Sequence, residues 1–181
     1  MLPAGVTIRP ATAADAPAVL GLLAQAFETY RTFAPEGWEP PVPDDGSALA
    51  LERHLVHPDI WYVVAEDDRG HAGQCGIAPG HERRSMQGPR IPGLAHFWQL
   101  FVREDHWGSG LADELHARSL DAMRERGYQR ARLLTPAGQA RSRRFYEKRG
   151  WRHAPISVAD PADLNGLEVV EYRLELQRNK R

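Results

Sequence analysis

The stretch Val102–Leu115, which reads V-R-E-D-H-W-G-S-G-L-A-D-E-L, contains the change from strand to glycine turn to helix that decides the fold. The residues that lead into it, His96–Val102, are aromatic and β-branched enough to predict a strand. After Ser109, apolar residues recur at helical spacing and predict an amphipathic helix. Gly108 and Gly110 allow the backbone to turn its N–H groups outward, and the start of the helix adds the partial positive charge of the helix dipole. The junction therefore predicts a site for an anion such as a pyrophosphate.

Two other phosphate motifs do not fit this turn. No Lys-Ser or Lys-Thr pair follows the glycines, as the loop of nucleotide triphosphatases requires. Asp113 stands where a dinucleotide fingerprint has its third glycine. Glycine is also common at a strand-to-helix junction that only makes a tight turn, so the turn by itself leaves both interpretations open.

Length and composition restrict the class of protein. The chain has 181 residues, 42% of them apolar, so we expect a single domain over residues 1–181. A formal net charge of −1 lacks the basic excess of a general nucleic-acid binder. A single cysteine, Cys75, leaves no disulfide framework and predicts a buried packing residue. No signal peptide or membrane-length apolar run is recognisable, so we expect a cytoplasmic protein that binds neither nucleic acid nor membrane.

The rest of the chain alternates helices and strands in a mixed order. One helix is predicted to start at Thr12 and Asp15 and to carry the apolar residues Val19, Leu22, Leu23 and Phe27. Further helices are predicted over Ala48–Val56 and Ala140–Arg149. Strands are predicted over Val6–Arg9, Ile60–Glu66, Ala72–Ala78, His96–Val102, Arg130–Thr135, Trp151–Val158 and Glu168–Leu176. Two irregular segments stand out, the proline-rich residues 30–46, which could form a lid, and the arginine-rich residues 80–93. The order predicts an α/β or α+β layer fold.

Two motifs in this pattern resemble the GNAT superfamily of acyl-CoA-dependent N-acetyltransferases. The first is the run V-x-x-x-x-x-G-x-G-L-A that begins at Val102, and the second is F-Y-E-K-R-G-W, which begins at Phe145 after a strand ending L-L-T-P. By order of elements the resemblance covers most of the chain, and it is most specific over Leu94–Trp151. It implies a mixed central sheet with a splayed central strand pair flanked by helices. It also implies acetyl-CoA as the acyl donor.

The glycine turn would then hold the coenzyme A pyrophosphate. The family writes this turn as Gln or Arg, x, x, Gly, x, Gly or Ala, and Gly110 and Ala112 fill the last two positions. Trp107 departs from the pattern at the first position. The main chain of Leu100 and Val102 matches the strand positions that supply backbone donors to the cofactor and to the developing oxyanion. The resemblance thus implies a cofactor site made of Leu100, Val102, Trp107, Gly108, Ser109, Gly110, Leu111, Ala112, Gln139, Ser142 and Tyr146.

The second motif supplies the candidate general acid. Gln139, Ser142 and Tyr146 stand where family members usually have Asn, Ala and Tyr. Gln139 can still offer its amide to the pantetheine arm, and Ser142 keeps its position small. By similarity, the phenol of Tyr146 would protonate the departing coenzyme A thiolate. The alternative is that Tyr146 is a packing aromatic, as we expect for its neighbour Phe145.

The attacking amine needs a proton acceptor near the acyl carbonyl. In several branches of the family a Glu or His base stands at the position of His96, and an imidazole titrates near neutrality. If the strand alternates without a break, His96 shares a face with Trp98 and Leu100. Two alternatives remain open: a structural role for this histidine, and a loop acid such as Glu36 or Glu82 that acts through water.

We therefore expect an acetyl-CoA-dependent N-acetyltransferase that acts on the primary amine of a small molecule in a ternary complex. The alternatives are a non-catalytic acyl-CoA-binding module and transfer to a peptide N-terminus or lysine. The eight histidines show no metal-ligand spacing, so no metal is expected. An exposed final strand could pair with a second copy to form a homodimer. Loop residues that could shape the acceptor pocket are Tyr30, Trp38, His81, Arg83, Arg84 and Arg90.

Overall fold

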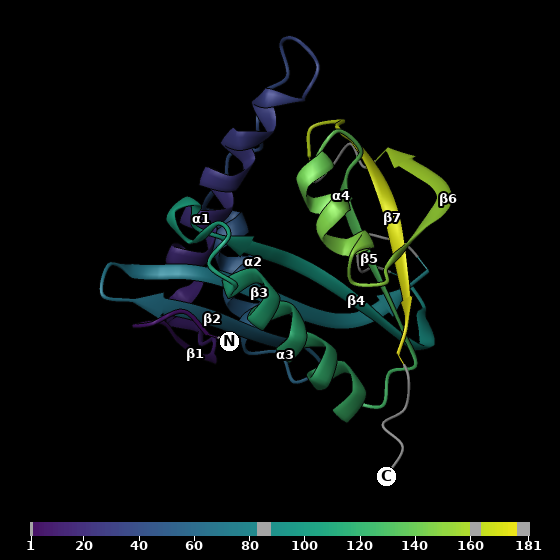
Figure 1. Ribbon diagram of the computed structural model, residues 1–181, viewed down its shortest axis with the longest axis horizontal. Helices are drawn as coiled ribbons and strands as arrows, with labels where there is room; N and C mark the ends of the chain where they lie inside the picture. Colours follow the sequence, from purple (N-terminus) through teal and green to yellow (C-terminus); the bar gives the residue numbers. More distant parts are fainter. Residues whose placement is uncertain (1, 83–87, 160–163, 177–181) are drawn as a thin grey trace.

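The framework of the chain is a seven-stranded sheet, seen in a computed structural model that describes residues 2–82, 88–159 and 164–176 (Figure 1). The strand order is β1-β2-β3-β4-β5-β7-β6. The pair β4 and β5 is parallel, and the other neighbouring pairs are antiparallel. The predicted mixed sheet is therefore confirmed. The strands are β1 (Thr7–Pro10), β2 (Trp61–Asp67), β3 (Gly70–His81), β4 (Arg90–Val102), β5 (Arg130–Pro136), β6 (Arg152–Ala159) and β7 (Glu168–Glu175).

Helices cover both faces of this sheet (Figure 1). On one face, Leu115 and Tyr146 pack with Phe97 of β4 in the largest buried cluster. On the other face, Val19 and Leu51 pack with the side chains of β2. None of the helices in the described part of the chain is long and apolar enough to cross a bilayer. The helices are α1 (Ala16–Thr29), α2 (Asp45–Leu55), α3 (Leu111–Glu125) and α4 (Ala140–Glu147).

The strands β4 and β5 separate after a short paired segment. Their parallel register joins Leu94–His96 to Arg130–Arg132. Beyond this point β4 continues to Val102 and β5 to Pro136 with no pairing between them. The splayed strand pair that the resemblance implied is therefore present, and its open end holds Leu100–Val102.

A bulge in β4 redirects the end of this strand. Trp98 lies opposite Gly76, and Phe101 lies opposite Gln74, so the residues between them on β4 outnumber those on β3. Gln99 in the bulge has a φ of 54°, in the left-handed region that side chains other than glycine rarely adopt. The hydroxyl of Tyr62 donates a hydrogen bond to Gln99 Oε1 at 2.7 Å and holds this conformation.

Because of this bulge, the expectation that the side chains of the strand alternate between the two faces without a break is wrong. Trp98 packs edge-on against Tyr62, on the face covered by α1 and α2. Leu100, two residues later, packs against the cluster on the α3 and α4 face. Because one extra residue separates them, Trp98 and Leu100 do not share a face.

The final strand also differs from expectation. In the sheet order β7 lies between β5 and β6, and the edge strands are β1 and β6. The final strand is therefore paired on both sides and cannot be the exposed edge through which a second copy would pair.

Gly76 provides a test of how closely Trp98 of β4 and Tyr62 of β2 pack over β3. A Cβ at this position would lie 2.5 Å from Tyr62 Cδ2 and 2.7 Å from Trp98 Nε1. We expect Gly76→Ala to lower the free energy of unfolding by about 1–3 kcal/mol, because neighbouring rings must move. Gly21→Ala in α1, where nothing lies within 4 Å of the added carbon, is the matched control. The control should stabilise the chain by up to about 1 kcal/mol in urea unfolding. Equal midpoints for the two variants would contradict this description of the bulge.

Candidate active site

A cavity of about 900 Å³ opens where β4 and β5 diverge. Its walls come from α1, the C-terminal end of β4, the segment that follows β4, and α4. Since α1 and α4 lie on opposite faces of the sheet, the cavity reaches both faces through the gap between the strands. The predicted site residues that line it are Leu100, Val102, Trp107, Ala112, Gln139, Ser142 and Tyr146.

The glycine turn forms the N-terminus of α3, as predicted. Gly108 and Gly110 have φ values of 80° and 92°, which only glycine adopts readily. Trp107 and Ala112 line the cavity at the two ends of the turn. The four residues between them, Gly108–Leu111, are not among the lining residues. Two N–H groups of the turn bond within it: Ser109 N donates to the carbonyl of His106 at 3.1 Å, and Leu111 N donates to Ser109 Oγ at 3.3 Å. The Leu111 side chain is fully buried in the core.

The main chain of β4 faces the open gap at Val102. Arg103 N donates to the carbonyl of Ala72 on β3 at 2.9 Å, whereas the Val102 carbonyl accepts the indole N–H of Trp107 at 3.1 Å. In a strand, the N–H and C=O of one residue point to the same edge. The N–H of Val102 therefore also points away from β3, where the strand has no neighbour. Such an N–H can serve as a fixed donor to a bound cofactor or to an oxyanion.

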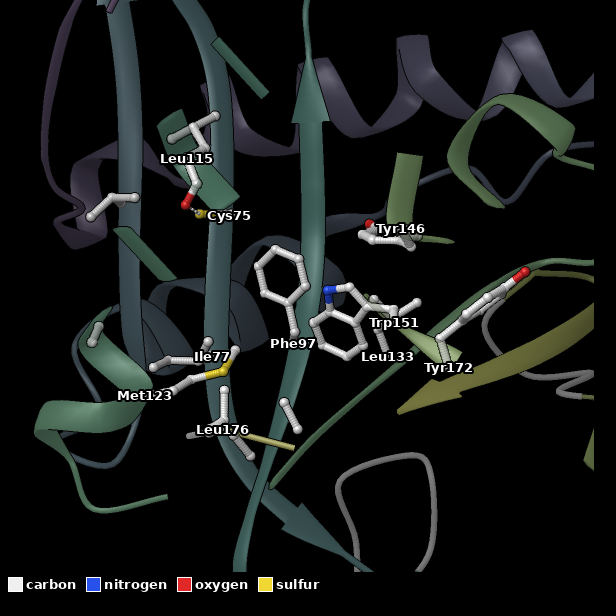
Figure 2. Close-up of a cluster of buried hydrophobic side chains, with 14 of the residues drawn as sticks. Cys75, Ile77, Phe97, Leu115, Met123, Leu133, Tyr146, Trp151, Tyr172 and Leu176 are labelled. Carbon is white, nitrogen blue, oxygen red and sulfur yellow. Dashed lines mark hydrogen bonds between the residues drawn. The ribbon is translucent and has the colours of Figure 1, made fainter. Parts of the chain in front are cut away.

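Tyr146 lines the cavity from α4 and is held by an aromatic cluster. Its ring centroid lies 5.9 Å from that of Trp151 and 6.4 Å from that of Phe97 on β4. Figure 2 shows the hydroxyl end of Tyr146 turned toward β4, above Trp151. The residue is 8% exposed, and burial raises the pKa of its phenol well above the ordinary value. The phenol is therefore protonated at neutral pH and can donate a proton.

Gln139 immediately precedes α4 at the cavity wall. Its side-chain carbonyl accepts a hydrogen bond from Thr135 Oγ1 at 3.3 Å. Because this contact uses the carbonyl oxygen, the amide N–H₂ of Gln139 can donate to a ligand. Phe145, expected only to pack, also lines the cavity, and the Arg149 guanidinium lies over its ring.

His96 does not fit the expected role of general base. It pairs with Arg132 in the segment where β4 and β5 are still joined, so it lies below the point at which the cavity opens, and it is not a lining residue. It is 6% exposed, and burial, with a smaller effect of Arg132, lowers its pKa to about 3. A base this weak is poorly matched to neutral pH. The alternative acids Glu36 and Glu82 are exposed and do not line the cavity either.

Two loops meet beside the C-terminal end of α1. The indole N–H of Trp38 donates to the carbonyl of Leu164 at 3.0 Å, and Asn165 Nδ2 donates to the carbonyl of Glu39 at 3.0 Å. Tyr30 is buried beneath this contact, with its ring centroid 6.5 Å from that of Trp38. The proline-rich segment is thus fastened to the turn between β6 and β7.

The described loop residues that were expected to shape the acceptor pocket do not line the cavity, Tyr30 and Trp38 included. Arg90 forms an ion pair with Asp59 at 2.5 Å, and His81 Nδ1 lies 2.6 Å from the carbonyl of Gly88. Neither Arg90 nor His81 lines the cavity. Arg83 and Arg84 lie outside the described residues.

Sequence reasoning missed several charged residues of the cavity. Glu28 lies on the α1 wall, while Arg69, Arg103 and Arg141 lie where the cavity opens beside the glycine turn. Glu28 belongs to the polar side of an amphipathic helix. The sequence pattern of such a helix is the same whether its polar side faces a cavity or bulk solvent. The arginines come from three separate segments, the β2–β3 turn, the residue after β4, and α4, and no local spacing joins them.

The ligand atoms of Asp67, Asp105 and His106 come within 4.8 Å of one another near this opening. Arg103 forms ion pairs with both carboxylates, at 2.5 Å to Asp67 and 2.8 Å to Asp105. His106 Nε2 lies 2.7 Å from Asp67 Oδ2. These contacts are sufficient to explain the cluster as an ion-pair network.

Solved acetyltransferase structures share this fold at low sequence identity. An N-acetyltransferase from Staphylococcus aureus Mu50 has a TM-score of 0.73 at 17% identity, over 95% of this chain and 99% of its own. The ribosomal-protein-alanine N-acetyltransferase from Brucella melitensis has a TM-score of 0.71 at 21% identity, over 94% and 99%. The paia N-acetyltransferase from Thermoplasma acidophilum, in complex with coenzyme A, has a TM-score of 0.69 at 16% identity, over 93% and 99%.

Sequence comparison identifies the family directly. A search of curated proteins finds no match to the chain. The profile of the acetyltransferase (GNAT) family, however, matches residues 23–151, which is more than half of the sequence and includes the splayed strands, the glycine turn and α4. The resemblance noted in the sequence is confirmed: the chain belongs to the GNAT family of acetyl-CoA-dependent acetyltransferases.

Proposed function

We propose that the chain transfers an acetyl group from acetyl-CoA to the primary amine of a small molecule, by direct attack in a ternary complex. The observation that carries this proposal is a protonated phenol, Tyr146, in the wall of a cavity at the open end of β4. Membership of an acetyltransferase family favours an enzyme over the non-catalytic acyl-CoA-binding alternative.

The cofactor would follow the open edge of β4 from the glycine turn inward. The N-terminus of the 15-residue helix α3 favours the pyrophosphate, through its dipole and the N–H groups of its first turn. The main chain of Leu100 and Val102, on the edge of β4 that does not pair with β5, and the Gln139 amide would suit the amide groups of the pantetheine arm. This arrangement would bring the thioester close to Tyr146.

The reaction would then need one proton donor and one proton acceptor. The amine nitrogen attacks the thioester carbonyl carbon, a C–N bond forms, and the backbone donors of β4 stabilise the oxyanion. As the C–S bond breaks, Tyr146 gives its proton to the coenzyme A sulfur. The proton lost by the amine balances the one that the thiolate receives.

Glu28 is our candidate for accepting the amine proton through water. The cavity has three carboxylates, and two of them, Glu104 and Asp105, lie in the turn beside α3, at the phosphate end. Glu28 lies on the opposite wall, on α1. Its Oε2 accepts a hydrogen bond from Arg31 at 2.7 Å, so Oε1 remains available to a water molecule. This assignment replaces His96 and the loop acids.

The loop contacts favour a small acceptor over a peptide. The hydrogen bonds from Trp38 to Leu164 and from Asn165 to Glu39 join the loops on either side of the α1 end. An extended peptide would need a continuous groove between these loops, whereas a small amine needs only a bounded pocket. Some structural neighbours are ribosomal-protein alanine acetyltransferases, but their low identity supports only a common fold.

The first test removes the proposed acid. Tyr146→Phe should lower kcat about 10²- to 10⁴-fold, since the thiolate must then leave without a positioned proton donor. Coenzyme A affinity, measured by calorimetry, should change little. Tyr128→Phe, on a half-buried tyrosine outside the cavity, is the matched control and should keep wild-type turnover. If Tyr146→Phe retains full kcat, Tyr146 is a packing aromatic.

The second test addresses the proton acceptor. Glu28→Gln should lower kcat at neutral pH about 10-fold or more, with the KM for acetyl-CoA unchanged. Glu36→Gln removes an equal charge from an exposed position outside the cavity and should have no effect. Equal rates for both variants would exclude Glu28.

The third test concerns the acceptor. Release of coenzyme A thiol should be followed with panels of amino acids, polyamines, aminoglycosides and N-terminal peptides. We expect turnover with one class of small amine and at least 10-fold lower kcat/KM with every peptide, because the joined loops restrict an extended chain. A peptide that proves the best substrate would contradict the small-molecule assignment. No turnover with any amine would contradict the proposed reaction.

A further inference from the structure

We propose that Arg141, held in place by the ring of Trp107, binds a phosphate group of the acyl-CoA where the cavity opens beside the glycine turn. This inference rests on the proposed use of acetyl-CoA and assigns a side-chain anion site that the backbone turn does not supply.

Two of the three arginines that line the cavity are already neutralised. Arg103 pairs with Asp67 and Asp105, and only 16% of its side chain is exposed. Arg69 Nη1 pairs with Asp105 at 2.6 Å. A phosphate that approached either guanidinium would have to displace a carboxylate or share the guanidinium with it. These two residues therefore complete the ion-pair network between the β2–β3 turn and the segment after β4.

Arg141 is different because its partner is neutral. Its guanidinium carbon lies 3.9 Å from the centroid of the Trp107 ring, in the geometry of a cation–π contact. Within the described residues it forms no ion pair with a carboxylate, although Glu104 and Asp105 line the same cavity. An aromatic face orients a guanidinium without cancelling its charge. Arg141 is thus the cavity arginine whose full charge remains available to an anionic ligand.

Trp107 is suited to position this cation. Its indole N–H donates to the Val102 carbonyl at 3.1 Å, which ties the ring to the end of β4, while 46% of the residue stays exposed at the opening. The ring therefore places the guanidinium of α4 beside the glycine turn. At the position of Trp107 the family pattern has Gln or Arg. In this chain the proposed cation comes from Arg141 on α4, and the tryptophan ring supports it.

The chemistry of the ligand follows from the donor. A guanidinium presents a planar fork of N–H groups that matches phosphate oxygens in a bidentate contact. Acetyl-CoA offers two such groups, the pyrophosphate and the 3′-phosphate. The proposal requires a phosphate contact of Arg141, and the experiment separates the two groups.

The experiment measures coenzyme A binding directly, by titration calorimetry, and so does not depend on turnover or on the acceptor. Arg141→Ala should weaken the Kd for coenzyme A about 10- to 100-fold, as expected for the loss of a charged hydrogen-bonding partner. Arg144→Ala removes the same charge from an exposed position on the same helix, outside the cavity, and should stay within about twofold of wild type. Thermal melts of both variants check that α4 remains folded.

A second pair of variants tests the positioning residue. Trp107→Ala should weaken coenzyme A binding by a smaller factor than Arg141→Ala, and Trp107→Phe, which keeps an aromatic face, should recover most of the loss. In turnover, both Trp107→Ala and Arg141→Ala should raise the KM for acetyl-CoA and leave kcat at saturation unchanged, because the contact is remote from the thioester.

The binding measurements distinguish the two phosphate groups of coenzyme A. If Arg141→Ala weakens coenzyme A but not 3′-dephospho-coenzyme A, the contact is to the 3′-phosphate, and if it weakens both equally, the contact is to the pyrophosphate. Both results support the proposal. Equal affinities for Arg141→Ala and Arg144→Ala would overturn it, while unchanged affinity in Trp107→Ala would overturn the role of the ring. A wild-type protein that binds no coenzyme A would overturn the proposed function itself.

Discussion

The separation of β4 from β5 is the constraint on which the rest of the molecule depends. Parallel pairing ends at His96 and Arg132, and the bulge at Gln99 then turns the main chain of β4 toward an empty edge. Unpaired backbone groups inside a sheet are costly unless a ligand or water satisfies them. The left-handed conformation of Gln99 has its own cost, offset in part by the hydrogen bond from Tyr62. The fold thus maintains a local defect, and the cavity forms at that defect.

The aromatic cluster on the α3 and α4 face keeps the defect open in a fixed geometry. Phe97, Trp151 and Tyr146 pack with centroids 5.9–6.4 Å apart and fasten α4 to β4 across the gap. His116 completes the cluster by accepting the Trp151 indole N–H at 2.9 Å, and burial lowers its pKa to about 4, so it stays neutral and remains an acceptor. The core and the proposed acid are therefore one structural unit, and changes to the packing would also move the phenol.

Sequence reasoning recovered the parts of this design that depend on local chemistry. The alternating elements, the glycine turn before α3 and Cys75 as a buried residue follow from periodicity, backbone freedom and composition, whereas the choice of Tyr146, which lines the cavity, came from the resemblance to the GNAT family. The errors arose where distant segments decide the outcome. The bulge at Gln99 depends on Tyr62 of another strand, and the burial of His96 depends on its place in β4 between the two paired strands β3 and β5. The pairing of Arg141 with Trp107 joins residues far apart in the chain, so no local spacing could have revealed it.

The extension of the cavity through the sheet has a further consequence for the order of events. If acetyl-CoA lies on the α3 and α4 side, as we propose, the amine can arrive along α1 on the other side. Each substrate would then have its own entrance, and neither would block the departure of the other. Binding in either order, with the two products leaving independently, is the kinetic behaviour that such a passage between two layers permits, whereas a single blind pocket would impose a fixed sequence.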